Sequence, residues 1–169
     1  MAKQLKDAYG KYFKEMVALS HAPDKIDETN IYQEANPELT KYMDLMLDDN
    51  FLPESGLGNI ENFKAFYDAV VKEKKKGLIL MEHYTNLDLP AIIYLLKNRD
   101  EEWAKDFSKR IVAVAGMKLN EAGPAVKVWT EGFTRVVIYP TRSLTKAEEQ
   151  AVSEEERAAE EAKARKINF

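Results

Sequence analysis

The sequence predicts an α/β protein, in which an N-terminal helical layer precedes a partial, mostly parallel sheet flanked by helices. Apolar residues recur at helical spacing through residues 1–75, whereas residues 76–143 alternate short apolar runs with helical patterns. An order of strand, helix, strand, helix, strand favours parallel pairing, because parallel neighbours need a crossover connection. We therefore expect a helical N-terminal region over 1–75 and a partial α/β domain over 76–169, ending in a charged helix.

Three helices are expected in the first region. The first is amphipathic and covers residues 1–20, and the second covers 37–48, with Pro37 in its first turn. The third follows Asn59, a residue type that caps helix N-termini, and is stopped by Gly77. The basic run "KEKKK" before this glycine is interpreted as a solvated last turn that complements the helix dipole.

The second region is expected to contain three strands, "LILME" at 78–82, "IVAVAG" at 111–116 and "TRVVIYP" at 134–140. Helices are expected between them and in the charged segment 145–167. Sheets usually have about five to six strands. Three strands followed by a polar helix therefore indicate that the chain is a fragment of a larger α/β domain.

Composition limits the function. The net charge of −4 argues against a general nucleic-acid binder, and the absence of cysteine excludes disulfides, thiolate catalysis and cysteine zinc sites. The N-terminus lacks the apolar core of a signal peptide, and the longest apolar runs are shorter than the roughly 18–20 residues that span a bilayer. We expect a cytoplasmic protein, for which peripheral membrane contact stays compatible with the sequence.

The candidate site is His83, one of two histidines, with Asp88 five positions later. The pair lies between the end of the expected strand 78–82 and the start of the next helix. In α/β proteins, catalytic and binding residues lie at the carboxyl ends of the strands. The carboxylate can reach one imidazole nitrogen and leave the other to take a proton. Spacing alone favours a plainer interpretation, with Asp88 as a helix N-cap ahead of Pro90 and His83 as an ordinary loop histidine.

The segment "NIENFKAFYDAVVKEKKKGLILMEHYTNLDLPAII" resembles the glycerol-3-phosphate acyltransferase family, closest to its soluble, plastid-type members. The family places an H-x4-D motif after an apolar strand and follows it with a Pro-Ala-Ile-Ile-like helix. His83 and Asp88 hold the motif positions, and residues 90–93 begin the helix. The resemblance is ordered and covers residues 40–143.

Further positions match downstream. "IVAVAGMKL" is similar to a family strand and turn, with Lys118 at the basic position, and Arg142 and Ser143 stand where the family carries a basic pair. Three positions depart from the family: Ser143 replaces a histidine, Leu89 separates the aspartate from the proline, and Glu82 replaces an asparagine.

The resemblance implies transfer of a fatty acyl group from acyl-CoA or acyl carrier protein to the sn-1 hydroxyl of glycerol 3-phosphate, in phospholipid biosynthesis. It implies His83 as general base and Asp88 as the residue that orients it. Arg142, Lys118 and Ser143 would bind the substrate phosphate. No metal and no redox cofactor is implied, and the partners are the two substrates rather than nucleic acid.

Two alternatives remain open. The first is a lysophosphatidate (sn-2) acyltransferase, which uses the same chemistry, and the second is a non-catalytic α/β binding module that keeps the motif as architecture. The family continues with a Gly- and Arg-rich phosphate loop and further strands, whereas this sequence ends at "AKARKINF". We therefore expect the isolated chain to have little activity and to self-associate through a bare sheet edge.

Overall fold

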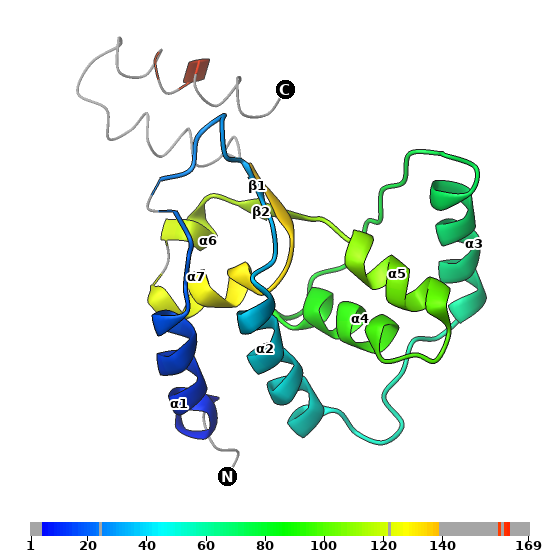
Figure 1. Ribbon diagram of the computed structural model, residues 1–169, viewed down its shortest axis with the longest axis horizontal. Coiled ribbons are helices and arrows are strands. Elements are labelled where there is room, and N and C mark those ends of the chain that lie inside the picture. The colour runs from blue at the N-terminus through cyan, green and yellow to red at the C-terminus, as the bar shows by residue number, and fades with distance from the viewer. Residues whose placement is uncertain (1–4, 24, 122, 139–158, 160, 163–169) are drawn as a thin grey trace. The chain divides into compact units, whose positions relative to one another are not determined.

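The computed structural model describes residues 5–23, 25–121, 123–138, 159 and 161–162 (Figure 1). The expected charged helix 145–167 therefore lies almost wholly outside the described residues. The elements in chain order are α1 (Leu5–Ala18), β1 (Tyr32–Gln33), α2 (Pro37–Asn50), α3 (Ile60–Val71), α4 (Asp88–Lys97), α5 (Glu102–Arg110), β2 (Ala113–Gly116), α6 (Lys118–Glu121), α7 (Pro124–Glu131) and β3 (Arg135–Ile138).

These elements form two compact units. The first unit contains Met1–Tyr42 together with Val112–Phe169, and the second contains Met43–Ile111. This division differs from the expected boundary at residue 75, because the N-terminal helix α1 packs against α7 from the other end of the chain. Within the part of the chain that the structure describes, no helix combines the length and apolarity needed to cross a membrane.

The first unit contains a three-stranded mixed sheet with the strand order β1-β3-β2. Strands β2 and β3 pair in parallel, with Val114 opposite Val136, as the order of strands and helices predicted. The short strand β1 was not expected, because two residues carry no periodicity, and it pairs antiparallel to β3. The sheet is therefore mixed, and its parallel part is confined to β2 and β3.

A buried core and a buried carboxylate hold the first unit together. Ile26, Met117 and Val137 form one buried apolar cluster against the sheet. The side chain of Glu131, at the end of α7, accepts hydrogen bonds from the Ser20 hydroxyl at 2.5 Å and from the backbone N–H of His21 at 2.9 Å. These bonds attach the chain that follows α1 to α7.

The second unit is helical. Helices α4 and α5 pack against each other as an antiparallel pair, and α3 packs on α5 (Figure 1). Its buried centre consists of Leu96, Ala104 and Phe107, surrounded by the partly buried aromatic side chains Phe63, Phe66, Tyr67 and Trp103. The sequence predicted α3 and α4 as helices, whereas the segment that forms α5 was expected only to continue or flank α4.

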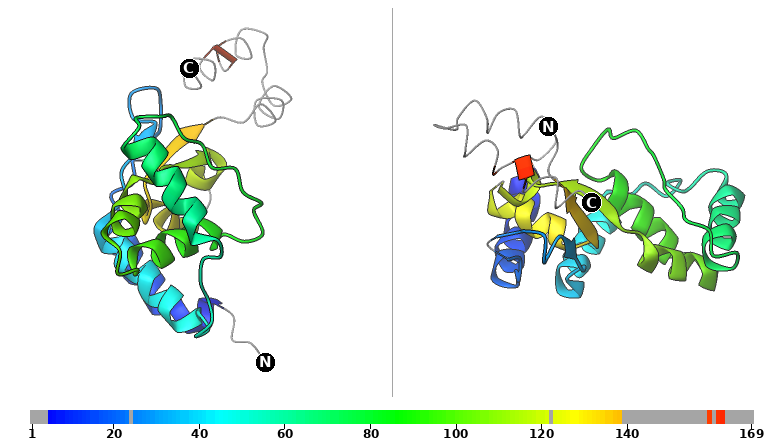
Figure 2. Two further views of the ribbon diagram at one scale, coloured as in Figure 1. Left: turned by 90° about the vertical axis from the view of Figure 1, so that its right-hand side faces the viewer. Right: turned by 90° about the horizontal axis from the view of Figure 1, so that it is seen from above.

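The expected strand 78–82 is absent, which corrects the sequence-based prediction. Residues 76–83 form a coil between α3 and α4 (Figure 2), and the side chains of Leu78 and Leu80 are 72% and 86% exposed. A strand is stabilised by hydrogen bonds to a neighbouring strand. No strand among the described residues pairs with this segment, so its apolar sequence alone does not make it β-structure.

The ends of α3 also differ from expectation. Asn59 adopts a left-handed conformation with φ of 48° and makes no side-chain capping bond. The helix ends at Val71 rather than at Gly77, because Lys74 takes the left-handed conformation (φ 58°) that usually closes a helix. Gly77 instead lies against α3, where an added Cβ would come within 2.4 Å of the Phe66 ring.

Candidate active site

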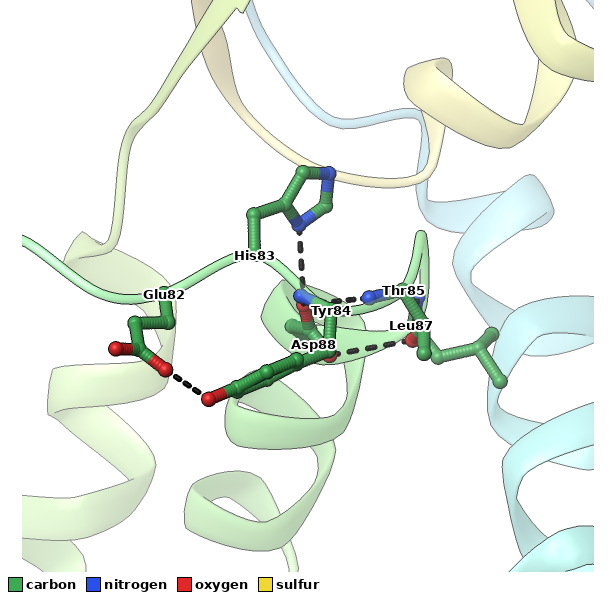
Figure 3. Close-up of polar contacts among 6 residues, drawn as sticks. All are labelled: Glu82, His83, Tyr84, Thr85, Leu87 and Asp88. Carbon is green, nitrogen blue, oxygen red and sulfur yellow. Dashed lines mark hydrogen bonds and ion pairs between the residues drawn. The ribbon is translucent and has the colours of Figure 1, made fainter.

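A tight turn before α4 is closed by the side chain of Asp88, the first residue of that helix (Figure 3). Its Oδ2 atom accepts hydrogen bonds from the backbone N–H groups of Tyr84 at 2.7 Å and Thr85 at 2.9 Å. The Thr85 hydroxyl donates to Oδ1 at 3.2 Å and accepts from the N–H of Leu87 at 3.0 Å. The carboxylate also lies at a helix N-terminus, where the helix dipole favours negative charge.

His83 is held by the same carboxylate. Its Nδ1 atom lies 3.0 Å from Oδ2 of Asp88, so the contact that the spacing predicted is present. In a neutral ring, a hydrogen bond to the carboxylate acceptor requires the proton on Nδ1 and leaves the lone pair on Nε2. Figure 3 shows Nε2 on the side of the ring that points away from Asp88, and the imidazole is 70% exposed. The ring is therefore oriented on one side and accessible on the other.

The environment of Asp88 keeps it ionised at neutral pH. The backbone hydrogen bond from Thr85 is the largest cause that lowers the pKa of Asp88, and the contact with His83 lowers it further. Partial burial acts in the opposite direction, since the side chain of Asp88 is only 18% exposed. An ionised carboxylate beside the ring stabilises an imidazolium, which is what a general base becomes after it takes a proton.

The interpretation of Asp88 as a helix N-cap is wrong. The N-cap position is Leu87, which makes no side-chain capping bond. The donors to Asp88 precede the helix, so the carboxylate closes the turn upstream of α4 instead of capping the helix. Pro90 lies in the first turn, where its missing N–H costs nothing.

One contact of the site was not anticipated. The Tyr84 hydroxyl donates a hydrogen bond to the carboxylate of Glu82 (Figure 3). In an extended chain, side chains two residues apart point to the same side. The spacing of Glu82 and Tyr84 was therefore the feature of the sequence from which this contact could have been predicted. Glu82 stands where the resembled family carries an asparagine, and here its carboxylate holds the exposed ring of Tyr84.

The structure does not test the assignment of Lys118, Arg142 and Ser143 to phosphate binding. Lys118 is exposed and is the first residue of α6, just after β2, but it belongs to the first unit. Arg142 and Ser143 lie outside the described residues. The structure thus brings together His83 and Asp88, and the three phosphate-binding assignments stay predictions.

Nothing in the described chain assembles three or more His, Asp or Glu side chains into a group that could hold a metal ion. Comparisons of the chain with protein-family models, with curated proteins and with solved structures find no match. Fold and site together define a mixed α/β protein that carries a histidine–carboxylate pair at the start of a helix.

Proposed function

We propose that the chain is an acyltransferase, which moves a fatty acyl group from acyl-CoA or acyl carrier protein to the sn-1 hydroxyl of glycerol 3-phosphate. The observation that carries the proposal is the 3.0 Å contact between Nδ1 of His83 and Oδ2 of Asp88, with Nε2 pointing away from the carboxylate (Figure 3). An imidazole held in this way suits proton abstraction from a hydroxyl. The resemblance of the H-x4-D segment to glycerol-3-phosphate acyltransferases supports this choice of reaction.

The proposed reaction uses the substrate alcohol as the nucleophile. As its oxygen attacks the thioester carbonyl, its proton passes to Nε2 of His83, and the ionised Asp88 stabilises the resulting imidazolium. The tetrahedral intermediate then collapses with loss of the thiolate, which takes the proton from the imidazolium and leaves as the thiol, and an ester remains. General-base assistance of this kind contributes about 10²–10⁴-fold to the rate. No covalent enzyme intermediate is needed.

Recognition of glycerol 3-phosphate requires positive charge close to His83. We assign this role to Arg142, whose guanidinium can bind a phosphate with two parallel N–H groups, together with Lys118 and Ser143. A lysophosphatidate acceptor would use the same histidine and aspartate. Turnover with each acceptor distinguishes these two substrates.

A non-catalytic binding module remains a second candidate, and one observation favours it. Asp88 accepts hydrogen bonds from the backbone N–H groups of Tyr84 and Thr85, which would retain an aspartate there without any chemistry. This interpretation assigns no task to the exposed His83. Substitution of the histidine therefore separates the candidates better than substitution of the aspartate.

The test is acyl transfer under single-turnover conditions, which detects slow reaction, with a long-chain acyl-CoA or acyl carrier protein as donor. Acceptors are glycerol 3-phosphate and lysophosphatidate. We expect His83→Ala to lower the rate by about 10²-fold or more. His21→Ala is the matched control, because within the described part of the chain the hydrogen bond of His21 is made by its backbone N–H and not by its ring. Equal rates for the wild-type and His83→Ala proteins would contradict the proposal.

A further inference from the structure

The connection between α3 and α4, residues 72–87, exposes apolar side chains in an unusual concentration. Five of them are exposed, namely Leu78, Ile79, Leu80, Met81 and Tyr84. Single exposed apolar residues are ordinary, but consecutive ones mark a surface that something covers. The core of this unit is built by α3, α4 and α5 without them, so they are not required for its packing.

Positive charge lies directly beside these apolar residues. Four lysines occur within residues 72–76, and two of them are neutralised locally, since Lys72 pairs with Asp68 and Lys75 pairs with Glu73. Lys74 and Lys76 form no ion pair with any described residue. The one carboxylate further along the connection, Glu82, accepts a hydrogen bond from Tyr84.

We propose that this connection docks on an anionic lipid surface. In this arrangement Leu78, Leu80 and Tyr84 enter the interface between headgroups and acyl chains, while Lys74 and Lys76 stay at the level of the anionic headgroups. Both the lysines and the apolar side chains then contact the lipid. The interaction is peripheral, because the chain lies on the lipid surface and does not cross it.

The two features together distinguish this partner from others. A nucleic acid would bind the lysines and leave the leucines in water. A second copy of the chain would cover the leucines but would bring the unpaired lysines of both copies close together, which costs electrostatic energy. An anionic bilayer satisfies both the apolar and the basic side chains, so it is the partner that the surface fits.

The inference goes beyond the proposed acyl transfer and does not depend on it. His83 belongs to the connection, so docking would place the histidine–carboxylate pair near the lipid surface. Its imidazole is not among the proposed anchoring groups, and His83→Ala should therefore bind vesicles as the wild-type protein does. A chain that binds vesicles but transfers no acyl group would contradict the acyl-transfer proposal alone. A chain that transfers acyl groups but binds no vesicles would contradict the lipid-docking proposal alone.

The test is co-sedimentation of the 169-residue chain with vesicles of phosphatidylcholine alone or of phosphatidylcholine with phosphatidylglycerol. We expect binding that needs the anionic lipid and weakens as salt is added. The double variants L78S/L80S and K74E/K76E should each bind roughly tenfold more weakly or worse. Matched controls are Leu52→Ser and Lys41→Glu, at exposed positions outside the connection, and both should bind like the wild-type chain.

The substituted side chains are exposed, so the variants should fold, and their circular dichroism and unfolding midpoints verify this. Vesicle binding that is absent, that ignores lipid charge, or that survives both double variants overturns the proposal. Concentration-dependent self-association, abolished by L78S/L80S and seen without vesicle binding, would also overturn it and would identify a second copy as the partner. If the chain bound an oligonucleotide, and K74E/K76E but not L78S/L80S abolished that binding, the lipid proposal would be overturned and nucleic acid would be identified as the partner.

Discussion

The backbone N–H of Thr85 lies 2.9 Å from Oδ2 of Asp88, and this hydrogen bond is the main reason that the pKa of Asp88 is lowered. A lowered pKa means that the ionised form stabilises the folded state. This contribution is fully present above the unfolded-state pKa of about 3.9 and is lost as the pH falls through the lowered folded-state pKa.

We therefore expect the wild-type chain to be more stable than Asp88→Asn near neutral pH, and this difference to shrink as the solution is acidified below about pH 4. Urea unfolding of both proteins at a series of pH values measures it. Asp49→Asn is the control, because Asp49 is exposed and makes no ion pair with a described residue. A difference between wild type and Asp88→Asn that does not change with pH would contradict the assignment.

Replacement of Glu131 by alanine should destabilise the first unit. The carboxylate is buried and accepts hydrogen bonds from the Ser20 hydroxyl and the His21 N–H, so two donors would lose their acceptor. Hydrogen bonds to charged groups are worth about 1.5–3 kcal/mol, and a loss in this range is expected in the free energy of unfolding. Glu131→Gln keeps one acceptor oxygen and should lose less. Equal losses for alanine and glutamine would show that the hydrogen bonds contribute little.

Gly77→Ala should destabilise the second unit, although the glycine lies outside any helix or strand. The added methyl group would meet the side chains of Phe66 and Val70 at 2.4 and 2.6 Å, so α3 or the connection must shift. Overpacking of this kind costs about 1–3 kcal/mol. Thermal or urea unfolding measures the loss. Gly56→Ala is the matched control, since a Cβ there meets no atom within 4 Å, and similar losses at both glycines would contradict a packing role.

The hydroxyl of Tyr94 should titrate later than an ordinary phenol. Its hydrogen bond to Asp48 and its burial raise the pKa of Tyr94 to about 12. A raised pKa stabilises the folded state below the unfolded-state value of about 10, and this contribution disappears as the pH rises through the folded value. Absorbance of tyrosinate during an alkaline titration measures it. Tyr94→Phe should remove one tyrosine from those that ionise at the highest pH. Loss of a tyrosine that ionises at lower pH would contradict the prediction.

Helices were predictable here because their signal is local. The apolar spacing in "IENFKAFYDAVV" and "DLPAIIYLLK" predicted α3 and α4, since one helical face must be buried whatever the remainder of the chain does. The parallel pair β2 and β3 was also predictable, because each is a short apolar run separated by a helix. The contact between His83 and Asp88 followed from five positions of spacing and a turn.

Features that depend on distant partners were not predictable in this way. "LILME" has the composition of a strand, but a strand also needs a neighbour, and composition cannot supply one. The end of α3 was set by the conformation of Lys74 and not by the glycine three positions later. The bond from Ser20 to Glu131 joins residues 111 positions apart, which no local pattern reveals.

The coil at residues 76–83 is a site where a protease should cleave the chain. Its peptide groups are in no helix or strand, and it begins at the last of three consecutive lysines, which are residues after which trypsin cleaves. Brief digestion should therefore divide the chain here before it attacks the helices. The packing of α3 on α5 would survive the cut, since it involves side chains on either side of it. The turn closed by Asp88 lies wholly on the C-terminal fragment, so His83 would keep its carboxylate partner after its covalent link to α3 was gone.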